Sequence, residues 1–401
     1  MSHIDKAPGT RLNTRWSVPE AASERAFSET GMKLWRHLAP ALAVGGILAG
    51  TCVAGSAAWA QDREVRVYNW SDYIDKNVLA EFTRDTGIKI IYDVYDSNDV
   101  LETKLMAGRS GYDIVVPSNN FLARQITAGI LSKLDRAKLP NLAHMDASLM
   151  ARMTKYDPGN EHAVIYLWGT SGLGVNLDKV KARMTNAPLN SLALLFDPAI
   201  VSKFADCGVN LLDAPDDVIP AVLTYLGLDP DSKKPADLAK AEAQLRKVRP
   251  FIRKFHSSQY INDLANGDTC VAFGFSGDIL QAKTRATEAR KGVNIAYLLP
   301  KEGGLMWFDS MAIPADAPNR ANAHTLMNYL MQPKVAARIS EAVQYPSANK
   351  DATALIKPET MADENVFPRA ETQKRLYTVT PNNQTQQRLM TRIWTRIKAA
   401  N

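Results

Sequence analysis

The sequence predicts an α/β protein of two lobes, with parallel-rich sheets flanked by helices and a ligand cleft between the lobes. Strand and helix patterns alternate from residue 65, and a second alternation begins after a run of small residues near position 170. Alternation of this kind is typical of parallel sheets that are covered by helices on both faces. With 401 residues, the chain is also long enough for two domains.

The composition is that of an ordinary globular chain. Hydrophobic residues make up 46% and charged residues 22% of the sequence, which excludes a disordered chain, a collagen-like chain and a multispanning membrane protein. The formal net charge of +6 comes from 48 basic and 42 acidic residues that are spread along the chain. Because the sequence contains no block of lysine and arginine, the charge does not indicate a nucleic-acid partner.

Residues 32–60 are typical of a secretory signal peptide. A short basic segment precedes a run from Leu38 to Trp59 that contains no charge, and Ala58-Trp59-Ala60 forms a small-residue cleavage pattern before Gln61. We therefore predict a cleaved signal peptide and an exported protein. An uncleaved membrane anchor is the alternative.

The rest of the chain divides into segments that alternate between the two lobes. The first 31 residues carry no periodic apolar pattern, and we interpret them as an extension upstream of a true start at Met32. The predicted organisation is an upstream extension over 1–31, the signal peptide over 32–60, lobe 1 over 61–167, lobe 2 over 168–305, a return to lobe 1 over 306–349, and a C-terminal helical segment on lobe 2 over 350–401.

The first lobe is predicted to begin with a β-α-β-α-β order. Gly87 and Gly108 end the two helices, and Ser97 caps the second one. In parallel sheets, ligands bind beyond the carboxyl ends of the strands. The predicted elements are a strand over 65–68, a helix that carries Ile74, Val78 and Phe82, a strand over 88–94, a helix that carries Leu101 and Leu105, and a strand over 114–116.

The middle of the chain is predicted to form a second α/β unit. The small residues at 168–172 suit a hinge or a crossover between the lobes. The predicted elements are strands over 163–167, 208–212, 270–275 and 293–299, a helix over 236–248, a turn at Gly303-Gly304, a strand that returns over 306–313, and helices over 321–331 and 333–342.

Two cysteines, Cys207 and Cys270, remain once the signal peptide and Cys52 are removed. In an oxidising compartment a disulfide is the usual state of such a pair. Neither cysteine has a neighbouring cysteine or histidine at the spacing of a zinc site. We therefore predict a disulfide between them and no metal site.

Motifs of common enzymes are incomplete in this sequence. The segment 274–278 resembles a nucleophile elbow, but Asp278 replaces its second glycine. Gly172-Leu173-Gly174 begins a dinucleotide fingerprint whose third glycine is replaced by Leu177. The acidic run 213–217 lacks the glycine and the distal glutamate of a calcium loop, and we interpret it as a helix N-terminus. We predict a protein without catalytic residues or cofactors.

Aromatic residues beside carboxylates recur at predicted strand ends. Taken singly, each is explained as a core residue or a turn residue. Taken together they suit an organic cation, because ring faces attract an ammonium group and a carboxylate accepts its hydrogen bonds. Several carboxylates around one cleft suit more than one ammonium group. The residues concerned are Trp70 with Asp72 and Tyr73, Phe275 with Asp278, Trp307 with Asp309, and Tyr345.

Several long motifs resemble one known family. The motifs are Tyr68-Asn69-Trp70-Ser71-Asp72-Tyr73-Ile74, Lys104-Leu105-Met106-Ala107-Gly108, Val115-Val116-Pro117-Ser118, the segment 255–268 (FHSSQYINDLANGD) and Leu299-Pro300-Lys301-Glu302-Gly303. They resemble the periplasmic polyamine-binding proteins of bacterial ABC importers, and most closely the putrescine receptors. The resemblance covers residues 63–398. It implies the two-lobed type II periplasmic binding protein fold, closure about a hinge, paired cysteines and no catalysis.

The resemblance also implies a set of polyamine contacts. These fall on Trp70, Ser71, Asp72, Tyr73, Ser118, Asp217, Phe275, Asp278, Trp307, Asp309 and Tyr345. Three of them depart from the pattern of the putrescine receptors: Asp217 stands where glutamate is common, Phe275 replaces a tryptophan and Trp307 replaces a phenylalanine. These exchanges keep the chemistry but alter the reach and the volume of the pocket, so they bear on which polyamine fits.

The resemblance implies a periplasmic receptor that captures a polyamine, putrescine first, and delivers it to the membrane permease of an ABC importer. It implies a monomer with no nucleic-acid partner. A receptor that prefers spermidine and a receptor that reports to a membrane sensor are alternatives. A further alternative is an exported enzyme that acts on polyamines, and the incomplete motifs argue against it.

Overall fold

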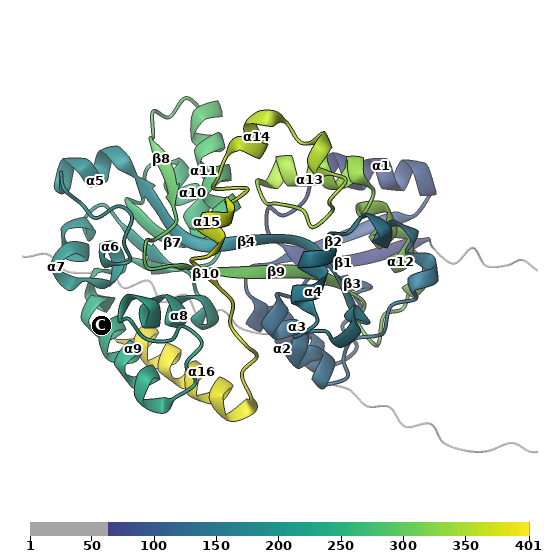
Figure 1. The fold of residues 1–401 in the computed structure, drawn as a ribbon, viewed down its shortest axis with the longest axis horizontal. Coiled ribbons are helices and arrows are strands. Elements are labelled where there is room, and N and C mark those ends of the chain that lie inside the picture. The colour runs from purple at the N-terminus through teal and green to yellow at the C-terminus, as the bar shows by residue number, and fades with distance from the viewer. Residues whose placement is uncertain (1–62, 401) are drawn as a thin grey trace, which may run out of the picture. The chain divides into compact units, whose positions relative to one another are not determined.

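The computed structural model describes residues 63–400 (Figure 1). The predicted upstream extension and signal peptide therefore lie outside the described residues. The strands of the described part are β1 (Glu64–Trp70), β2 (Lys89–Tyr95), β3 (Ile114–Val115), β4 (Ala163–Asn176), β5 (Val209–Leu211), β6 (Lys254–Phe255), β7 (Val271–Phe275), β8 (Ile295–Leu298), β9 (Gly304–Ala312) and β10 (Leu376–Tyr377).

Helices alternate with these strands, as the sequence predicts. They are α1 (Lys76–Thr86), α2 (Asn98–Met106), α3 (Asn119–Thr127), α4 (Ala147–Met153), α5 (Leu177–Arg183), α6 (Ala193–Phe196), α7 (Pro198–Val201), α8 (Pro215–Tyr225), α9 (Pro235–Val248), α10 (Gln259–Ala265), α11 (Ser276–Glu288), α12 (Arg320–Leu330), α13 (Pro333–Val343), α14 (Pro358–Ala362), α15 (Ala370–Gln373) and α16 (Gln384–Ala399). Short 3-10 turns lie between some of them.

The strands form one mixed sheet in the order β2-β1-β3-β9-β4-β7-β5-β6, with β10 on β9 and β8 on β4. The outer strands pair in parallel, β1 with β2 and β3, and β5 with β6 and β7. The two central strands pair mainly antiparallel, since β4 is antiparallel to β7, β8 and β9, and β9 is antiparallel to β3 and parallel to the short strand β10. Both central strands are buried along their whole length. A strand buried on both faces has the same apolar pattern in either direction, so the sequence pattern does not show its orientation.

Strand β4 passes straight through the segment 168–172, for which the sequence suggests a hinge or crossover. The strand is continuous over 14 residues, and the small residues lie in it because aromatic rings pack against them. A Cβ atom on Gly169 would lie 2.6 Å from the Trp307 ring, and one on Gly172 would lie 2.6 Å from the Tyr297 hydroxyl. In Figure 1, β4 and β9 run side by side across the middle of the sheet.

Two hydrophobic cores lie at the two ends of the sheet. The first contains residues of β1 to β3, the first part of β4, β9, α12 and α13, and the second contains residues of the last part of β4, β5, β7 to β8, α8, α9 and α16. Ala163 to Trp168 of β4 belong to the first core and Leu173 to the second. Near the C-terminus, Ala352 and Ile356 pack against residues of α13, whereas α16 packs beside α8 and α9 (Figure 1).

The ends of several helices follow from their sequences. The Asp75 side chain accepts a hydrogen bond from the Asn77 backbone amide at the start of α1, and Gly87 ends that helix with a left-handed φ of 69°. The acidic run forms the start of α8, as predicted, with Asp216 and Asp217 in its first turn. Carboxylates are stabilised at this position by the helix dipole.

Cys207 and Cys270 form the predicted disulfide, with their Cα atoms 5.5 Å apart. The bond joins the segment before β5 to the segment before β7, and these two strands pair in parallel. Both cysteines are buried in the second core. The disulfide therefore links two parts of one core.

Replacing both cysteines by alanine is expected to lower the free energy of unfolding by about 2–4 kcal/mol, because the bond closes a loop whose ends are 63 residues apart in the sequence. Urea unfolding of the wild type and of the double variant measures this difference. Reducing agent should lower the stability of the wild type and leave the double variant unchanged. A double variant as stable as the oxidised wild type would contradict the expectation.

Within residues 63–400, no helix has the length and apolar character that a membrane span requires.

Candidate functional site

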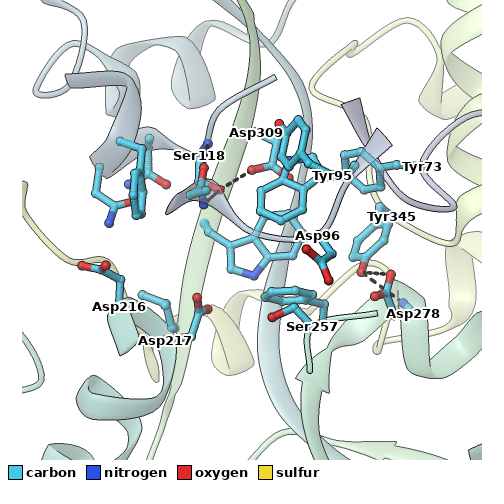
Figure 2. Close-up of a pocket in the computed structure, with 18 of the residues that line it drawn as sticks. Tyr73, Tyr95, Asp96, Ser118, Asp216, Asp217, Ser257, Asp278, Asp309 and Tyr345 are labelled. Carbon is cyan, nitrogen blue, oxygen red and sulfur yellow. Dashed lines mark hydrogen bonds between the residues drawn. The ribbon is translucent and has the colours of Figure 1, made fainter. Parts of the chain in front are cut away.

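A cavity of about 690 Å³ lies between the two cores, and Figure 2 shows side chains that line it. Its lining includes ten of the eleven residues that the sequence analysis assigns to a ligand site. These ten are Trp70, Ser71, Tyr73, Ser118, Asp217, Phe275, Asp278, Trp307, Asp309 and Tyr345. Asp72 is not part of the lining.

Three of the lining residues lie where strands end, as the sequence analysis expects. Trp70 is the last residue of β1, Phe275 is the last residue of β7, and Ser118 precedes α3 shortly after β3. The expectation is wrong for Trp307 and Asp309, which lie in the middle of β9. Because β9 runs through the centre of the sheet, its middle borders the cavity.

Three carboxylates of the cavity accept hydrogen bonds from hydroxyl groups of the protein. The Ser118 hydroxyl donates to Asp309 over 2.6 Å, and the Ser171 hydroxyl donates to Asp217 over 2.8 Å. Asp278 accepts two such bonds, from Tyr260 and Tyr345, each of 2.8 Å. Figure 2 shows two of these contacts, Ser118 with Asp309 and Tyr345 with Asp278. The hydroxyl groups fix the directions of the carboxylates.

Burial raises the pKa of each of these three carboxyl groups. The pKa values of Asp217, Asp278 and Asp309 are all raised to about 7, mainly because the groups are removed from water. The hydroxyl donors lower each pKa, but by less than burial raises it. Near neutral pH the site therefore holds carboxyl groups that are close to their titration midpoints, and a cation would favour their ionised forms.

The charged side chains that line the cavity are all carboxylates. Asp96 and Asp216 line the cavity together with the three carboxylates already described. Within the described part of the chain, the lining contains no lysine, arginine or histidine side chain. A ligand that complements this lining must bring positive charge itself, because buried carboxylates need a partner.

Aromatic rings form a connected wall of the cavity. The Phe275 ring lies 6.3 Å from the Trp70 ring and 5.5 Å from the Trp307 ring, measured between centroids. The Trp307 ring lies 5.4 Å from the Tyr345 ring, which in turn lies 5.2 Å from Tyr73. These pairs meet at steep interplanar angles. Ring faces beside carboxylates suit a cation with an apolar body.

Asp72 has a partner within the protein. Its carboxylate accepts a hydrogen bond of 2.7 Å from Arg285, and the two side chains form an ion pair. Asp72 follows β1, on the side of the first core, and Arg285 lies in α11, which packs in the second core. The pair therefore joins the two sides of the cavity. Direct contact of Asp72 with a ligand stays a prediction.

Several site residues are absent from the sequence-based set. Tyr95 is the last residue of β2 and Asp96 follows it, so the search for aromatic and acidic residues at strand ends could have found both. Tyr260 and Ser171 bind carboxylates of the site from α10 and β4. Tyr260 lies in the motif 255–268, which does not by itself assign it a role, and Ser171 lies in the segment for which the sequence suggests a hinge. Within residues 63–400, no three His, Cys, Asp or Glu side chains are grouped so as to hold a metal ion.

An anionic cavity with aromatic walls, set between two cores that share one sheet, is the arrangement of a solute-binding protein. Residues 77–368 match the family of bacterial extracellular solute-binding proteins. The chain belongs to this family.

Curated relatives agree with this assignment. The chain is 51% identical over 353 residues to the putrescine-binding periplasmic protein SpuD of Pseudomonas aeruginosa (strain UCBPP-PA14), a match that covers 88% of this chain and 96% of the relative. It is 48% identical over 358 residues to the putrescine-binding periplasmic protein PotF of Escherichia coli (strain K12), with 88% and 97% covered. The resemblance stated from the sequence motifs is thus confirmed.

Solved structures share the fold. A putative spermidine/putrescine ABC transporter from Listeria monocytogenes superposes with a TM-score of 0.77 at 28% identity, and the match covers 84% of this chain and all of that one. The spermidine/putrescine substrate-binding protein PotD of Streptococcus pneumoniae superposes with a TM-score of 0.67 at 27% identity, with 84% and 98% covered. The predicted type II periplasmic binding protein fold is confirmed by these structures.

Proposed function

We propose that this protein is a periplasmic receptor that captures a polyamine, putrescine first, and delivers it to an ABC importer. The observation that carries the proposal is the lining of the cavity, which has five carboxylates, a wall of aromatic rings and, among the described residues, no basic side chain. A diamine supplies two ammonium groups and an apolar middle, which are the complements of these two kinds of surface. The relatives SpuD and PotF, which are putrescine-binding proteins, support the same ligand class.

In this proposal, residues 61–167 and 306–349 form one lobe and residues 168–305 form the other, as the sequence analysis predicts. Asp309 lies on β9 in the first core and Asp278 on α11 in the second. One ammonium group bound by each carboxylate connects the two lobes. The ligand binds the closed arrangement better than the open one, so it shifts the population toward closure. The Asp72–Arg285 ion pair adds a second connection across the cavity.

The rings and hydroxyl groups complete the site. Trp70, Phe275 and Trp307 cover the methylene groups of the ligand and present ring faces to its ammonium groups. The hydroxyl donors of Ser118, Tyr260 and Tyr345 occupy some lone pairs of the carboxylates, and the remaining lone pairs accept from the ligand. The protein carries out no reaction on the ligand, acts as a monomer and needs no cofactor.

The test is calorimetry with a panel of diamines and triamines, followed by product analysis of the same mixtures. We expect one putrescine to bind per protein and every ligand to be recovered unchanged. Tighter binding of spermidine would change the ligand assignment, and release of a product would point to the alternative, an exported enzyme. Absence of binding to the whole panel would refute the proposal.

The aromatic wall gives a selectivity prediction. Phe275 lies between Trp70 and Trp307, so a larger ring at this position would fill space in the cavity. We expect the wild type to prefer putrescine, and Phe275→Trp to weaken spermidine binding by a larger factor than putrescine binding. Competition between the two ligands measures the ratio. Phe255→Trp, which changes a phenylalanine outside the cavity lining, is the matched control and should leave the ratio unchanged.

A further inference from the structure

The segment 274–278, which resembles an incomplete nucleophile elbow, forms the junction between β7 and α11. Two of its glycines leave space for tyrosine rings. A Cβ atom on Gly274 would lie 2.4 Å from the ring of Tyr260, and one on Gly277 would lie 2.5 Å from the ring of Tyr345. The two rings belong to different hydrophobic cores. The glycines of this motif are therefore explained by packing against tyrosines.

The Tyr260 hydroxyl is both an acceptor and a donor at this junction. It accepts a hydrogen bond of 2.9 Å from the Phe275 backbone amide and donates one of 2.8 Å to Oδ2 of Asp278. The Tyr345 hydroxyl repeats the pattern, because it accepts from the Asp278 amide over 3.0 Å and donates to Oδ1 over 2.8 Å (Figure 2). An amide N–H can only donate, so each hydroxyl has its own hydrogen left for the carboxylate.

The directions of these bonds disfavour the neutral form of Asp278. Burial raises the pKa of Tyr260 and of Tyr345 well above the usual value of tyrosine, so both hydroxyls keep their protons near neutral pH. A proton on the carboxyl group that pointed toward either tyrosine would meet the hydrogen of its O–H group. The two bonds thus favour the carboxylate. They oppose the effect of burial, which raises the pKa of Asp278 to about 7.

Other charged groups act on Asp278 from the neighbouring elements. Asp72, which follows β1, raises its pKa, and Arg285 of α11 lowers it. Asp72 and Arg285 also form an ion pair with each other, so they act on Asp278 in opposite senses and as a pair. Across the cavity, the charge of Asp278 raises the pKa of Asp309 in β9. Among the described residues, the hydrogen bonds to the Asp278 carboxylate come from the two tyrosines.

The two tyrosines differ in their relation to the cavity. Tyr345 lines it, whereas Tyr260 lies outside the lining and is only 1% exposed. Tyr260 lies in the first turn of α10, which packs against α11, the helix that carries Asp278. Tyr260 can therefore act on a ligand only through the groups that its hydroxyl binds.

We propose, on the basis of the function proposed above, that Tyr260 is a positioning residue of the ligand site: its hydroxyl, held as a donor by the Phe275 amide, keeps Asp278 ionised and fixes that carboxylate relative to the aromatic wall. Phe275 contributes a ring to this wall, and its backbone amide binds the same hydroxyl as the carboxylate. One hydroxyl thus sets the relation between the two kinds of surface that a diamine contacts.

The experiment is titration calorimetry of Tyr260→Phe with putrescine from pH 6 to 9. The variant keeps the ring and loses only the hydroxyl. Because a hydrogen bond to a charged group is lost, Asp278 should ionise at a pH higher by about one unit or more. We expect putrescine affinity to fall at least about fivefold at pH 7 and no more than about twofold at pH 9. Binding at pH 7 should also release more protons than in the wild type.

Tyr297→Phe is the matched control. Tyr297 is a buried tyrosine of the same core, and its hydroxyl forms a hydrogen bond of 2.7 Å with Thr170, outside the cavity lining. This variant loses a buried hydroxyl that binds no carboxylate, so its binding should depend on pH as in the wild type. The same loss of affinity at pH 7 and at pH 9 in Tyr260→Phe, or no loss at either pH, would overturn the positioning role and leave the receptor function standing.

A measurement without ligand separates this proposal from the function on which it rests. Carboxyl carbon NMR follows the titration of Asp278, whose signal is identified by its absence in Asp278→Asn. We expect the signal to titrate at a higher pH in Tyr260→Phe than in the wild type and in Tyr297→Phe. An unchanged titration would overturn the positioning role whatever the protein binds. Failure of the wild type to bind any polyamine would instead refute the function itself.

Discussion

Asp278→Asn and Asp309→Asn are each expected to weaken putrescine binding by at least about tenfold, because loss of one partner of a buried charge pair costs about 2–5 kcal/mol. Each carboxylate is buried in the cavity and held by hydroxyl donors. Asparagine has nearly the same shape, and its Oδ1 atom can accept from Ser118 at position 309 and from one of the two tyrosine hydroxyls at position 278, while the charge is lost. The ammonium group would then be buried opposite a neutral amide.

Calorimetry of the two variants beside the wild type measures this loss. Asp135→Asn is the matched control, since Asp135 is an exposed carboxylate that pairs with Lys138 away from the cavity. Without ligand, the variants should be at least as stable as the wild type at pH 8, because removal of an unpaired buried charge relieves a desolvation cost. Unchanged affinity in both variants would refute the assignment of these carboxylates.

The second large effect concerns pH. The pKa values of Asp217, Asp278 and Asp309 are raised to about 7 by burial, whereas alkylammonium groups titrate near pH 10. Between pH 5 and 8 the ligand keeps its charge, and only the carboxyl groups change. Affinity should therefore rise with pH, by up to about a hundredfold for each carboxyl group that must ionise.

Titration calorimetry at pH 6 in two buffers of different ionisation enthalpy tests this expectation. Binding at pH 6 should release protons into the buffer, and binding at pH 8.5 should release almost none. The stability of the ligand-free protein should change in the opposite sense. Because the folded state binds these protons more tightly than the unfolded chain, stability should fall as the pH rises from about 4 through 7. Affinity that is constant from pH 5 to 8 would show that these carboxyl groups are not the ligand's partners.

The opening elements of the first lobe, from β1 to β3, could be predicted from the sequence because they are short and locally marked, whereas α3 and α4 were not predicted. Asp75 and Gly87 mark the two ends of α1. The alternation of strands and helices from β1 to β3 predicts parallel pairing, and β1 does pair in parallel with β2 and β3. The directions of the central strands could not be predicted, because β4 and β9 are buried throughout and such strands look the same in either direction. In the structure the two strands pair antiparallel. Orientation depends on contacts between distant segments, which a local pattern does not record.

The same limit applies to the site. Aromatic and acidic residues at predicted strand ends, such as Trp70 and Asp278, were predicted and line the cavity. The contacts between these side chains were not predicted, because the two partners are far apart in the sequence. Asp72 and Arg285 are 213 positions apart, and Ser118 and Asp309 are 191 apart. A polar residue on an interior helix, such as Tyr260, looks like an ordinary core residue until its partner is known.

The continuity of β4 has a mechanical consequence for lobe closure. A loop hinge concentrates rotation at a few residues, whereas a continuous strand that pairs with β9 up to Thr170 and with β7 from Ser171 must spread any bend over several peptide units. Gly169 and Gly172, which lie at the passage between the cores, have rings of Trp307, Tyr345 and Tyr297 against them, so curvature there also shifts side chains of the cavity. The elastic energy of this strand is therefore one component of the affinity for any ligand that closes the lobes, and substitutions in it can alter affinity without touching the ligand.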